Sequence, residues 1–536
     1  MAPGASLPWR RLTVLLFPLF LALAVALFFR VAIGTKVPRG IVSVKTDVQK
    51  YRAHHSHLTM DLITRAASIT GTLPAQRIDA AGQPHVDQRA VLALALPLMA
   101  NSAVQIVLNL TDMWFIGHIS TQALAAVGTV QWLVLAVVLV LGGVGSAVQP
   151  IVAQAQGARR YRRASQAVWT ALWATLCTVP LFVGIGMSGQ LILAPFGFDA
   201  HIRDLAASFW MPRVSGSAFG SAVWALLGFF NGVGRPRVTV LVTAVTAVAN
   251  IIFNDLFIFR LGLGVAGSGW ATTAAQALGL LLGLGVFLGA RYRHYRPHLT
   301  WKPHAGRLWQ QLRLGLPMGI MPAADLLGFS IFQMMQVRLG TIGGAATQMV
   351  TVLTSISYMP GFGIAQAGTT LVGQSIGAGD RAWAMRVGTR VILMGAAYMG
   401  AIGVVIAFAG PWVLPFFADA HDADAAATVA LGANLLWLAA AFQFFDGLNL
   451  GSSMCLRGAG DAIVPAALVL PVSLLWFVPL AHSFTFAPGQ GWFHFLPQFG
   501  WGAYGGWVAV VLYLMLLGSV LFLRWRSGVW QRMQTL

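Results

Sequence analysis

Four aspartates lie within long apolar stretches of the sequence: Asp112, Asp255, Asp325 and Asp446. Such stretches, about 20 residues long, allow a helix to cross a hydrocarbon core of about 30 Å. A carboxylate near the bilayer centre costs about 2.5–3.5 kcal/mol on an insertion scale, so it is expected to face a cavity, take up a proton or bind a cation. Asp112, Asp325 and Asp446 are therefore candidate ion-coupling residues.

Asp325 and Asp446 are expected to lie at a similar depth in the membrane. At 1.5 Å per residue, Asp325 is ~18 Å along its helix from Arg313, and Asp446 is ~16 Å from Arg457. Both arginines mark the same side of the membrane, so the two carboxylates are predicted to form one site that either a proton or Na⁺ neutralises. Asp112 is expected in the outer half of the other helix bundle.

Asp255 has a different expected role. It follows Asn250 and Asn254, which share one helical face at i, i+4, but it is rotated by ~100° from Asn254. It also lies close to the end of its apolar stretch. We expect a solvated helix end at Asp255 rather than an ion site.

The composition indicates an integral membrane protein. Of the 536 residues, 57% are hydrophobic and 9% are charged, and the mean hydropathy is +0.73. So few charges do not solvate a soluble globule of this size. The net charge of +19 comes from short basic clusters between apolar stretches, so it reflects membrane topology and not nucleic-acid binding.

The sequence carries no motif of an enzyme. It has no Ser-His-Asp arrangement and no nucleotide-binding loop, and it has no Glu for an H-E-x-x-H zinc motif. We expect a protein without catalytic residues, and without a cofactor other than a coupling ion. Cys177 and Cys455 lie in apolar stretches, where small buried side chains are expected rather than metal ligands or a disulfide.

The apolar stretches predict an all-α membrane protein with a twelve-helix core, since the alternating strands of a β-barrel are not seen. Arginines gather in the loops after the second, fourth, sixth and eighth helices, so these loops and both ends of the core are expected in the cytoplasm. The acidic residues are Asp and not Glu, and most basic residues are Arg and not Lys, which indicates a GC-rich bacterial genome. Together with the apolar stretches, this predicts a multi-pass protein of a bacterial inner membrane. The predicted spans are 90–116, 122–156, 164–188, 201–230, 236–259, 265–291, 308–337, 343–376, 386–412, 425–456, 462–487 and 503–524.

The core is an internal duplication. Residues 92–158 share their framework with residues 312–378, and residues 231–234 match residues 457–460. Six helices in each half make parallel repeats about an axis along the membrane normal. The predicted units are an N-terminal six-helix bundle (89–305) and a C-terminal six-helix bundle (306–536).

Residues 1–88 form an N-terminal extension. Its apolar run at 12–29 predicts a signal-anchor helix, a thirteenth transmembrane segment, and a basic, solvated linker follows. Translation starting at Met60 is the alternative.

Motifs in both halves resemble those of the multidrug and toxic compound extrusion (MATE) transporters over about residues 89–525. Asp112, Asp325 and Asp446 fall at the acidic positions of the bacterial branch with acidic residues in helices 1, 7 and 10, although that branch commonly has Glu where this chain has Asp325. The other residues that carry the resemblance are Pro97, 113–117, Gln154, 157–158, Asn250, Asn254, 264–267, Pro317, 372–374, 377–380 and 456–461.

The resemblance implies antiport by alternating access, in which inward movement of Na⁺ or H⁺ drives export of organic cations. The expected partners are small organic cations, the coupling ion and the lipid bilayer, without nucleic acid, and a monomer is expected. Aromatic and Met side chains accommodate varied cations, so Phe329, Phe332, Met335, Tyr358 and Met359 are candidate substrate-binding residues. The polar residues Asn250 and Asn254 are further candidates. Pro97, Pro317, Arg457 and Asp461 are expected to act in structure or gating.

A lipid-linked-oligosaccharide flippase of the same architecture is the alternative. It would need several basic residues in its cavity to hold a pyrophosphate, whereas the helices contain chiefly Arg213, Arg338 and Arg457. A passive channel is disfavoured, because a two-bundle repeat suits alternating access.

Overall fold

The computed structural model describes residues 73–80, 82–196, 199–417, 424–493 and 495–532. The predicted helix at 12–29 and Met60 lie outside these residues. The helical segments of the N-terminal half are α3 (Gln88–Gly117), α4 (Thr121–Ser146), α5 (Val148–Gly157), α6 (Tyr161–Met187), α7 (Gly189–Leu193), η1 (Ala194–Phe196), α8 (Ala200–Ser215), α9 (Ser217–Gly232), α10 (Pro236–Asn254), η2 (Asp255–Arg260), α11 (Gly264–Leu288), η3 (Ala290–Tyr295) and η4 (Pro297–Leu299).

The C-terminal half is built in the same order from long helices. Its segments are α12 (Ala305–Arg338), α13 (Thr341–Gly377), α14 (Arg381–Val413), η5 (Leu414–Phe417), α15 (Ala425–Ala459), α16 (Ile463–Pro471), η6 (Val472–Phe477), α17 (Val478–Thr485), α18 (Gly502–Arg526) and η7 (Val529–Arg532).

Each of the twelve predicted helices is present, but three of them are interrupted, and the fifth changes at Asp255 from α10 to the π-helical η2. The second divides into α4 and α5 at Ala147, because Pro150 lacks an N–H and its ring meets the carbonyl of Ser146. The fourth divides into α8 and α9 at Gly216, four residues after Pro212. The eleventh consists of α16, the π-helical η6 and α17.

Within the described residues, eleven segments are long and apolar enough to cross a membrane. Of the twelve predicted helices, α13 is the one missing from this set, because Gly, Thr, Ser and Gln lower its hydropathy. It packs against α3 and α5 of the first half and against α14 and α15 of the second. Its polar side chains therefore contact other helices, and the structure is that of an all-α, multi-pass membrane protein.

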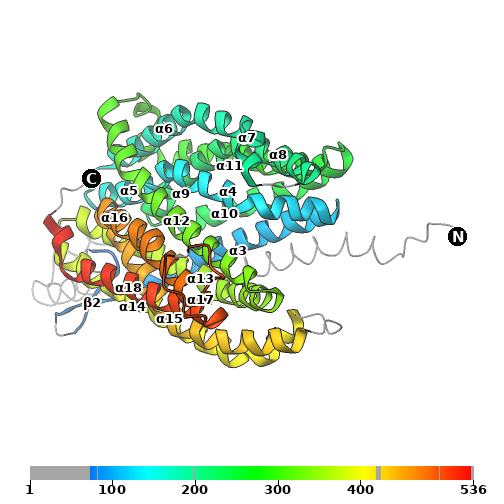
Figure 1. Ribbon diagram of the computed structural model, residues 1–536. Coiled ribbons are helices and arrows are strands. Elements are labelled where there is room, and N and C mark those ends of the chain that lie inside the picture. The colour runs from blue at the N-terminus through cyan, green and yellow to red at the C-terminus, as the bar shows by residue number, and fades with distance from the viewer. Residues whose placement is uncertain (1–72, 81, 197–198, 418–423, 494, 533–536) are drawn as a thin grey trace, which may run out of the picture.

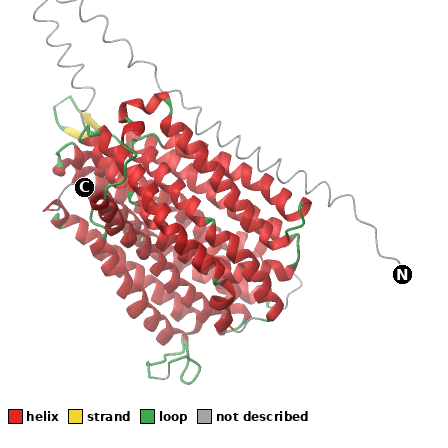
Figure 2. Cartoon of the chain, turned by 90° about the horizontal axis from the view of Figure 1, so that it is seen from above, coloured by secondary structure: helices red, strands yellow, loops and turns green. Residues whose placement is uncertain are grey.

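The two halves lie side by side and pack through a few helices. Figure 1 shows the N-terminal half above and the C-terminal half, which runs from green through yellow to red, below, and Figure 2 shows the helices running roughly parallel. Between the halves, α12 packs on α4, while α13 packs on α3 and α5. A Cβ at Gly143 of α4 would lie 2.6 Å from the backbone nitrogen of Gly319 in α12, so the close approach of these helices requires glycine.

The predicted linker before the core was wrong in its last part. Residues 76–86 form an antiparallel hairpin of β1 (Gln76–Ile78) and β2 (Pro84–Val86). The indole N–H of Trp383 in α14 donates to the carbonyl of Pro74 at 2.9 Å, which ties this segment to the C-terminal half.

The prediction for Cys177 was also wrong, whereas Cys455 is buried as expected. Cys177 lies on the same part of α6 as Leu176 and Leu181, both more than half exposed. An apolar stretch in a bilayer protein can face lipid as well as protein, and here it faces outward.

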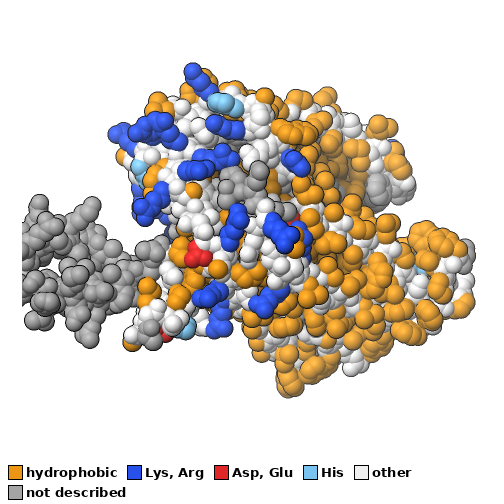
Figure 3. All heavy atoms as spheres, turned by 90° about the vertical axis from the view of Figure 1, so that its left-hand side faces the viewer, with side chains coloured by type: hydrophobic (Ala, Val, Ile, Leu, Met, Phe, Trp, Pro, Cys, Tyr) orange, Lys and Arg blue, Asp and Glu red, His pale blue; other side chains and the backbone are white. Residues whose placement is uncertain are grey.

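Basic side chains gather at one end of the helices. Figure 3 shows Lys and Arg on the face that forms the left-hand side of Figure 1, beside a largely hydrophobic surface. By the positive-inside rule we expect this end to face the cytoplasm, and we refer to it as the cytoplasmic end. A cysteine at Arg160, which is exposed here, should therefore resist labelling by an impermeant reagent from outside, whereas one at Asp422, outside the described residues, should react. The opposite pattern would reverse the topology.

Candidate ion and substrate site

Asp325 of α12 and Asp446 of α15 come together in the C-terminal half. Both side chains remain partly accessible, and they lie close enough for their charges to interact. The phenol of Tyr513 in α18 donates to Oδ1 of Asp325 at 2.5 Å. Side chains from three helices thus form one acidic site. The sequence predicted that the two carboxylates lie at similar depths in their helices, which allows them to lie near each other.

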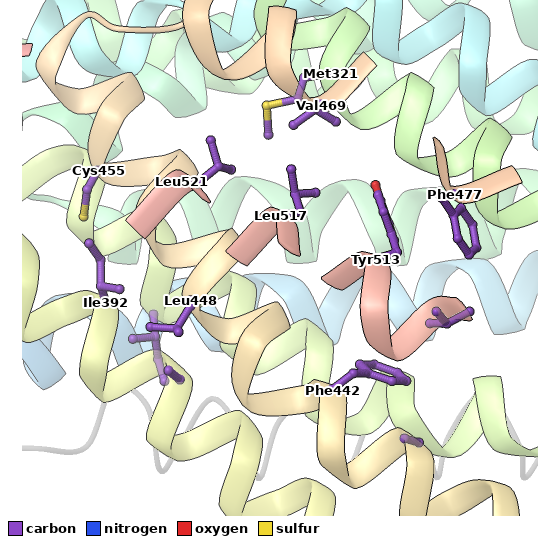
Figure 4. Packing of buried hydrophobic residues seen from close by; sticks show 14 of the residues in the cluster. Met321, Ile392, Phe442, Leu448, Cys455, Val469, Phe477, Tyr513, Leu517 and Leu521 are labelled. Carbon is purple, nitrogen blue, oxygen red and sulfur yellow. The ribbon is translucent and has the colours of Figure 1, made fainter. Parts of the chain in front are cut away.

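Packing holds Tyr513 in place. Its ring stacks on Phe477 with centroids 4.6 Å apart and an interplanar angle of 21°. Figure 4 shows both rings within the C-terminal core, where Leu517 and Leu521 follow Tyr513 along α18. A hydroxyl on a ring fixed in this way can orient one oxygen of Asp325 and leave the other free for an ion.

Polar and basic groups surround this acidic pair. Asn449 lies close enough to Asp446 to act on its carboxylate, while its own Oδ1 is buried without a partner within the described structure. Arg457 lies close enough to Asp325 for their charges to interact, and Tyr358 of α13 is near both carboxylates. Arg457 was expected to act at the cytoplasmic end of α15, but its guanidinium reaches toward the acidic pair.

Asp461 is separate from the acidic pair. Its carboxylate is fully buried and forms a salt bridge of 3.0 Å with Arg524 of α18. The bond joins the loop after α15 to the end of α18, an arrangement that suits the structural role expected for Asp461.

A second acidic site lies in the N-terminal half. Nδ2 of Asn254 donates to Oδ1 of Asp112 at 2.7 Å and to Oδ1 of Asn250 at 3.0 Å. Asn250 donates in turn to the hydroxyl of Thr272 in α11 at 3.3 Å. Arg213 of α8 is close enough for its charge to act on Asp112. Sequence reasoning identified the Asp and both Asn residues but missed Thr272 and the proximity of Arg213.

Both asparagines were predicted to be substrate candidates, yet neither has any exposed side chain in this conformation. Among the aromatic and Met candidates, Phe332 and Met335 are also fully buried, and Phe332 packs edge-on against Trp507 at 5.7 Å. These four residues offer no surface to a ligand here. Tyr358 is 37% exposed, and Phe329 and Met359 are partly exposed.

Asp255 was expected at a solvated helix end; its side chain is partly exposed, but the helix continues beyond it to Arg260. It begins the π-helical η2 and pairs with Arg260, with 2.9 Å between Oδ2 and Nε. Pro97 and Pro317, the predicted gating prolines, lie inside the continuous helices α3 and α12.

The cytoplasmic ends of the two halves are joined by reciprocal contacts between the repeated motifs. Gln154 of α5 donates to the carbonyl of Gly458 at 3.0 Å, and Gln374 of α13 donates to the carbonyl of Gly232 at 2.8 Å. We call this set of contacts the cytoplasmic latch. The duplication in the sequence showed that these motifs correspond, but not that each half bonds the other.

Glycines let the latch close. A Cβ on Gly157 would overlap the carbonyl oxygen of Gln374, and a Cβ on Gly377 would overlap that of Gln154. The two helix ends therefore meet backbone to backbone. The helices α5 and α13 are thus in direct contact at the arginine-rich end of the protein.

The fold and the two acidic sites define a multi-pass membrane protein built from a duplicated helical unit with ionisable groups inside each half. The MatE family model matches residues 97–256 and 317–481, more than half of the chain. The protein therefore belongs to the MATE family of transporters.

Curated relatives match along most of their length. The chain is 28% identical to the "probable multidrug resistance protein NorM" of Rhizobium meliloti (strain 1021) over 451 residues, covering 82% of this chain and 92% of that protein. It is 30% identical over 401 residues to the "multidrug resistance protein NorM" of Burkholderia vietnamiensis, covering 72% of this chain and 85% of that protein.

Solved structures share the fold. A MATE protein in its straight conformation superposes with a TM-score of 0.72 at 20% identity, covering 83% of this chain and 96% of that one. A MATE protein in a bent conformation gives a TM-score of 0.69 at 19% identity, covering 82% and 95%.

Proposed function

We propose that this protein exports organic cations from the cytoplasm of a bacterium in exchange for inward-moving Na⁺ or H⁺. It would act as a monomer in the inner membrane, without a cofactor other than the coupling ion, which is a substrate. The observation that carries the proposal is the pair Asp325 and Asp446, two partly accessible carboxylates in apolar helices whose charges interact.

Two negative charges held together in a bilayer protein need a cation or a proton. Carboxylate and amide oxygens are suitable ligands for a hard cation, and Asn449, whose Oδ1 is unpartnered, lies near Asp446. The same charges attract a cationic drug, which the partly exposed ring of Tyr358 can contact through its π face. Ion and drug would then compete for one negative site, so binding of the ion from outside would favour release of the drug there.

The names of the NorM relatives support the multidrug part of this proposal. The contacts of the cytoplasmic latch support alternating access, because such a transporter must close its inner end while it releases its substrate outside. The latch must open again for a drug to enter from the cytoplasm.

Transport in proteoliposomes tests the proposal. We expect efflux of a fluorescent organic cation when either a Na⁺ gradient or a pH gradient is imposed, and the effective gradient identifies the coupling ion. The control is a vesicle with the same membrane potential and neither gradient. Efflux that ignores both gradients would refute antiport.

A further inference from the structure

A basic pocket lies at the cytoplasmic end of the protein, away from the acidic sites. It is lined by residues of α5, α6 and α12, and it is a small open pocket with a cavity volume of about 20 Å³, or about 270 Å³ when the open space around its mouth is included. Arg163 and Arg307 line it together with Gln166, Gln310 and Gln311. We call it the Arg163–Arg307 pocket. It lies where the N-terminal half meets the C-terminal half, because α6 and α12 belong to different halves.

The positive charge of this pocket is not balanced by the protein. Arg160 and Arg307 are both close enough to Arg163 for their like charges to repel. Within the described residues, none of these three arginines forms a salt bridge with an acidic side chain. The Nε of Arg163 is buried without a hydrogen-bond partner, while its Nη2 is 3.5 Å from Oε1 of Gln310. A bound anion would balance the positive charge of these arginines and accept hydrogen bonds from them.

Two helix N-termini add to the positive potential. Arg163 lies in the first turn of α6 and Arg307 in the first turn of α12, and neither helix has an acidic residue in that turn. Neither N-cap makes a side-chain hydrogen bond to the helix. The free N–H groups and the helix dipoles therefore favour an anion at the same place as the guanidinium groups.

Exposed tryptophans place the pocket at the depth of the lipid head groups. Trp309 lies on α12 between Arg307 and Gln310 and is 68% exposed, and Trp301 just before α12 is 49% exposed. The indole of Trp173 in α6 donates to the carbonyl of Trp301 at 2.7 Å, which fixes this segment against α6. Tryptophans in such positions mark the membrane–water interface, and Figure 3 shows basic and hydrophobic surfaces meeting at this end.

We propose that the Arg163–Arg307 pocket binds the phosphate group of an anionic phospholipid from the cytoplasmic leaflet. The planar guanidinium groups suit phosphate oxygens, and the glutamine amides can donate to the same group. Basic pockets between transmembrane helices on the cytoplasmic side bind anionic head groups by this chemistry. The acyl chains stay in the bilayer beside Trp309. A lipid held by α6 and α12 together would stabilise the contact between the two halves.

Thermal unfolding of the purified full-length protein in a neutral detergent tests this site. Phosphatidylglycerol should raise the Tm of the wild-type protein by several degrees, since a ligand that binds only the folded state stabilises it. Phosphatidylcholine and inorganic phosphate should give much smaller shifts. The double variant Arg163→Gln/Arg307→Gln should lose most of the shift caused by phosphatidylglycerol.

The matched control is Arg237→Gln/Arg293→Gln, which removes the same charge from exposed positions outside the pocket and should keep the shift. A second variant, Gln310→Glu, places a negative charge in the pocket and should also abolish the shift, which covers the case in which the double variant fails to fold. Equal shifts with phosphatidylcholine, or equal loss in the control, would overturn the proposal. An arginine-dependent shift with inorganic phosphate but none with phosphatidylglycerol would overturn the lipid as its source. None of these readouts depends on transport, so they are independent of the proposed function.

Discussion

Asp325→Asn and Asp446→Asn should each reduce gradient-driven efflux of an organic cation to the passive leak. The amide is nearly isosteric with the carboxylate, so folding is expected to persist, and in the first variant Tyr513 can still donate to the side-chain oxygen that the amide retains. Each substitution removes the charge that the ion and the drug would share. The measurement is efflux from proteoliposomes under an imposed Na⁺ or pH gradient, with thermal unfolding as the test of folding.

The matched control is Asp255→Asn. Asp255 is a carboxylate in the same protein, but it lies near the end of its helix, is partly exposed and pairs with Arg260. Exposed ion pairs contribute about 0–1 kcal/mol, so this variant should fold and transport at the rate of the wild-type protein. If both site variants also pump at that rate, the acidic pair is structural and the proposed coupling is wrong.

Gly157→Ala and Gly377→Ala should shift the protein away from the conformation closed at its cytoplasmic end. Each new Cβ would overlap a backbone carbonyl of the opposite half, and backbone atoms cannot move aside as a flexible side chain can. Overpacking of a close contact costs about 1–3 kcal/mol, and about 1.4 kcal/mol changes a population tenfold. Both variants should therefore depopulate the closed latch about tenfold or more and slow transport.

Spin labels at the two cytoplasmic helix ends, one at Arg160 and one at Arg381, would measure this shift as a longer distance between the labels. Gly184→Ala is the matched control, since Gly184 lies within α6 and a Cβ there meets no other atom within 4 Å. An unchanged distance distribution in Gly157→Ala and Gly377→Ala would show that the latch does not hold the two ends together.

The sequence by itself determined the class of the protein and the places of its acids. Long apolar stretches predict membrane-spanning helices because the cost of an unsolvated backbone leaves few other structures. Arginines between the stretches predict the cytoplasmic side, and a carboxylate stands out because apolar neighbours surround it. The repeat of residues 92–158 at 312–378 predicted two similar halves. These signals are local or periodic, so they can be recognised from the sequence alone.

Only the tertiary structure decided which groups meet. Asp325 bonds Tyr513, 188 residues away, and the contact between Gln154 and Gly458 spans 304 residues. The tertiary structure also decided that Phe332 and Met335 are buried in the C-terminal core and that Cys177 is exposed. In a bilayer, lipid and protein interiors are both apolar, so hydropathy does not determine how a helix is rotated. Close packing at glycines and hydrogen bonds between distant helices determine that rotation, and these exist only once the helices have assembled.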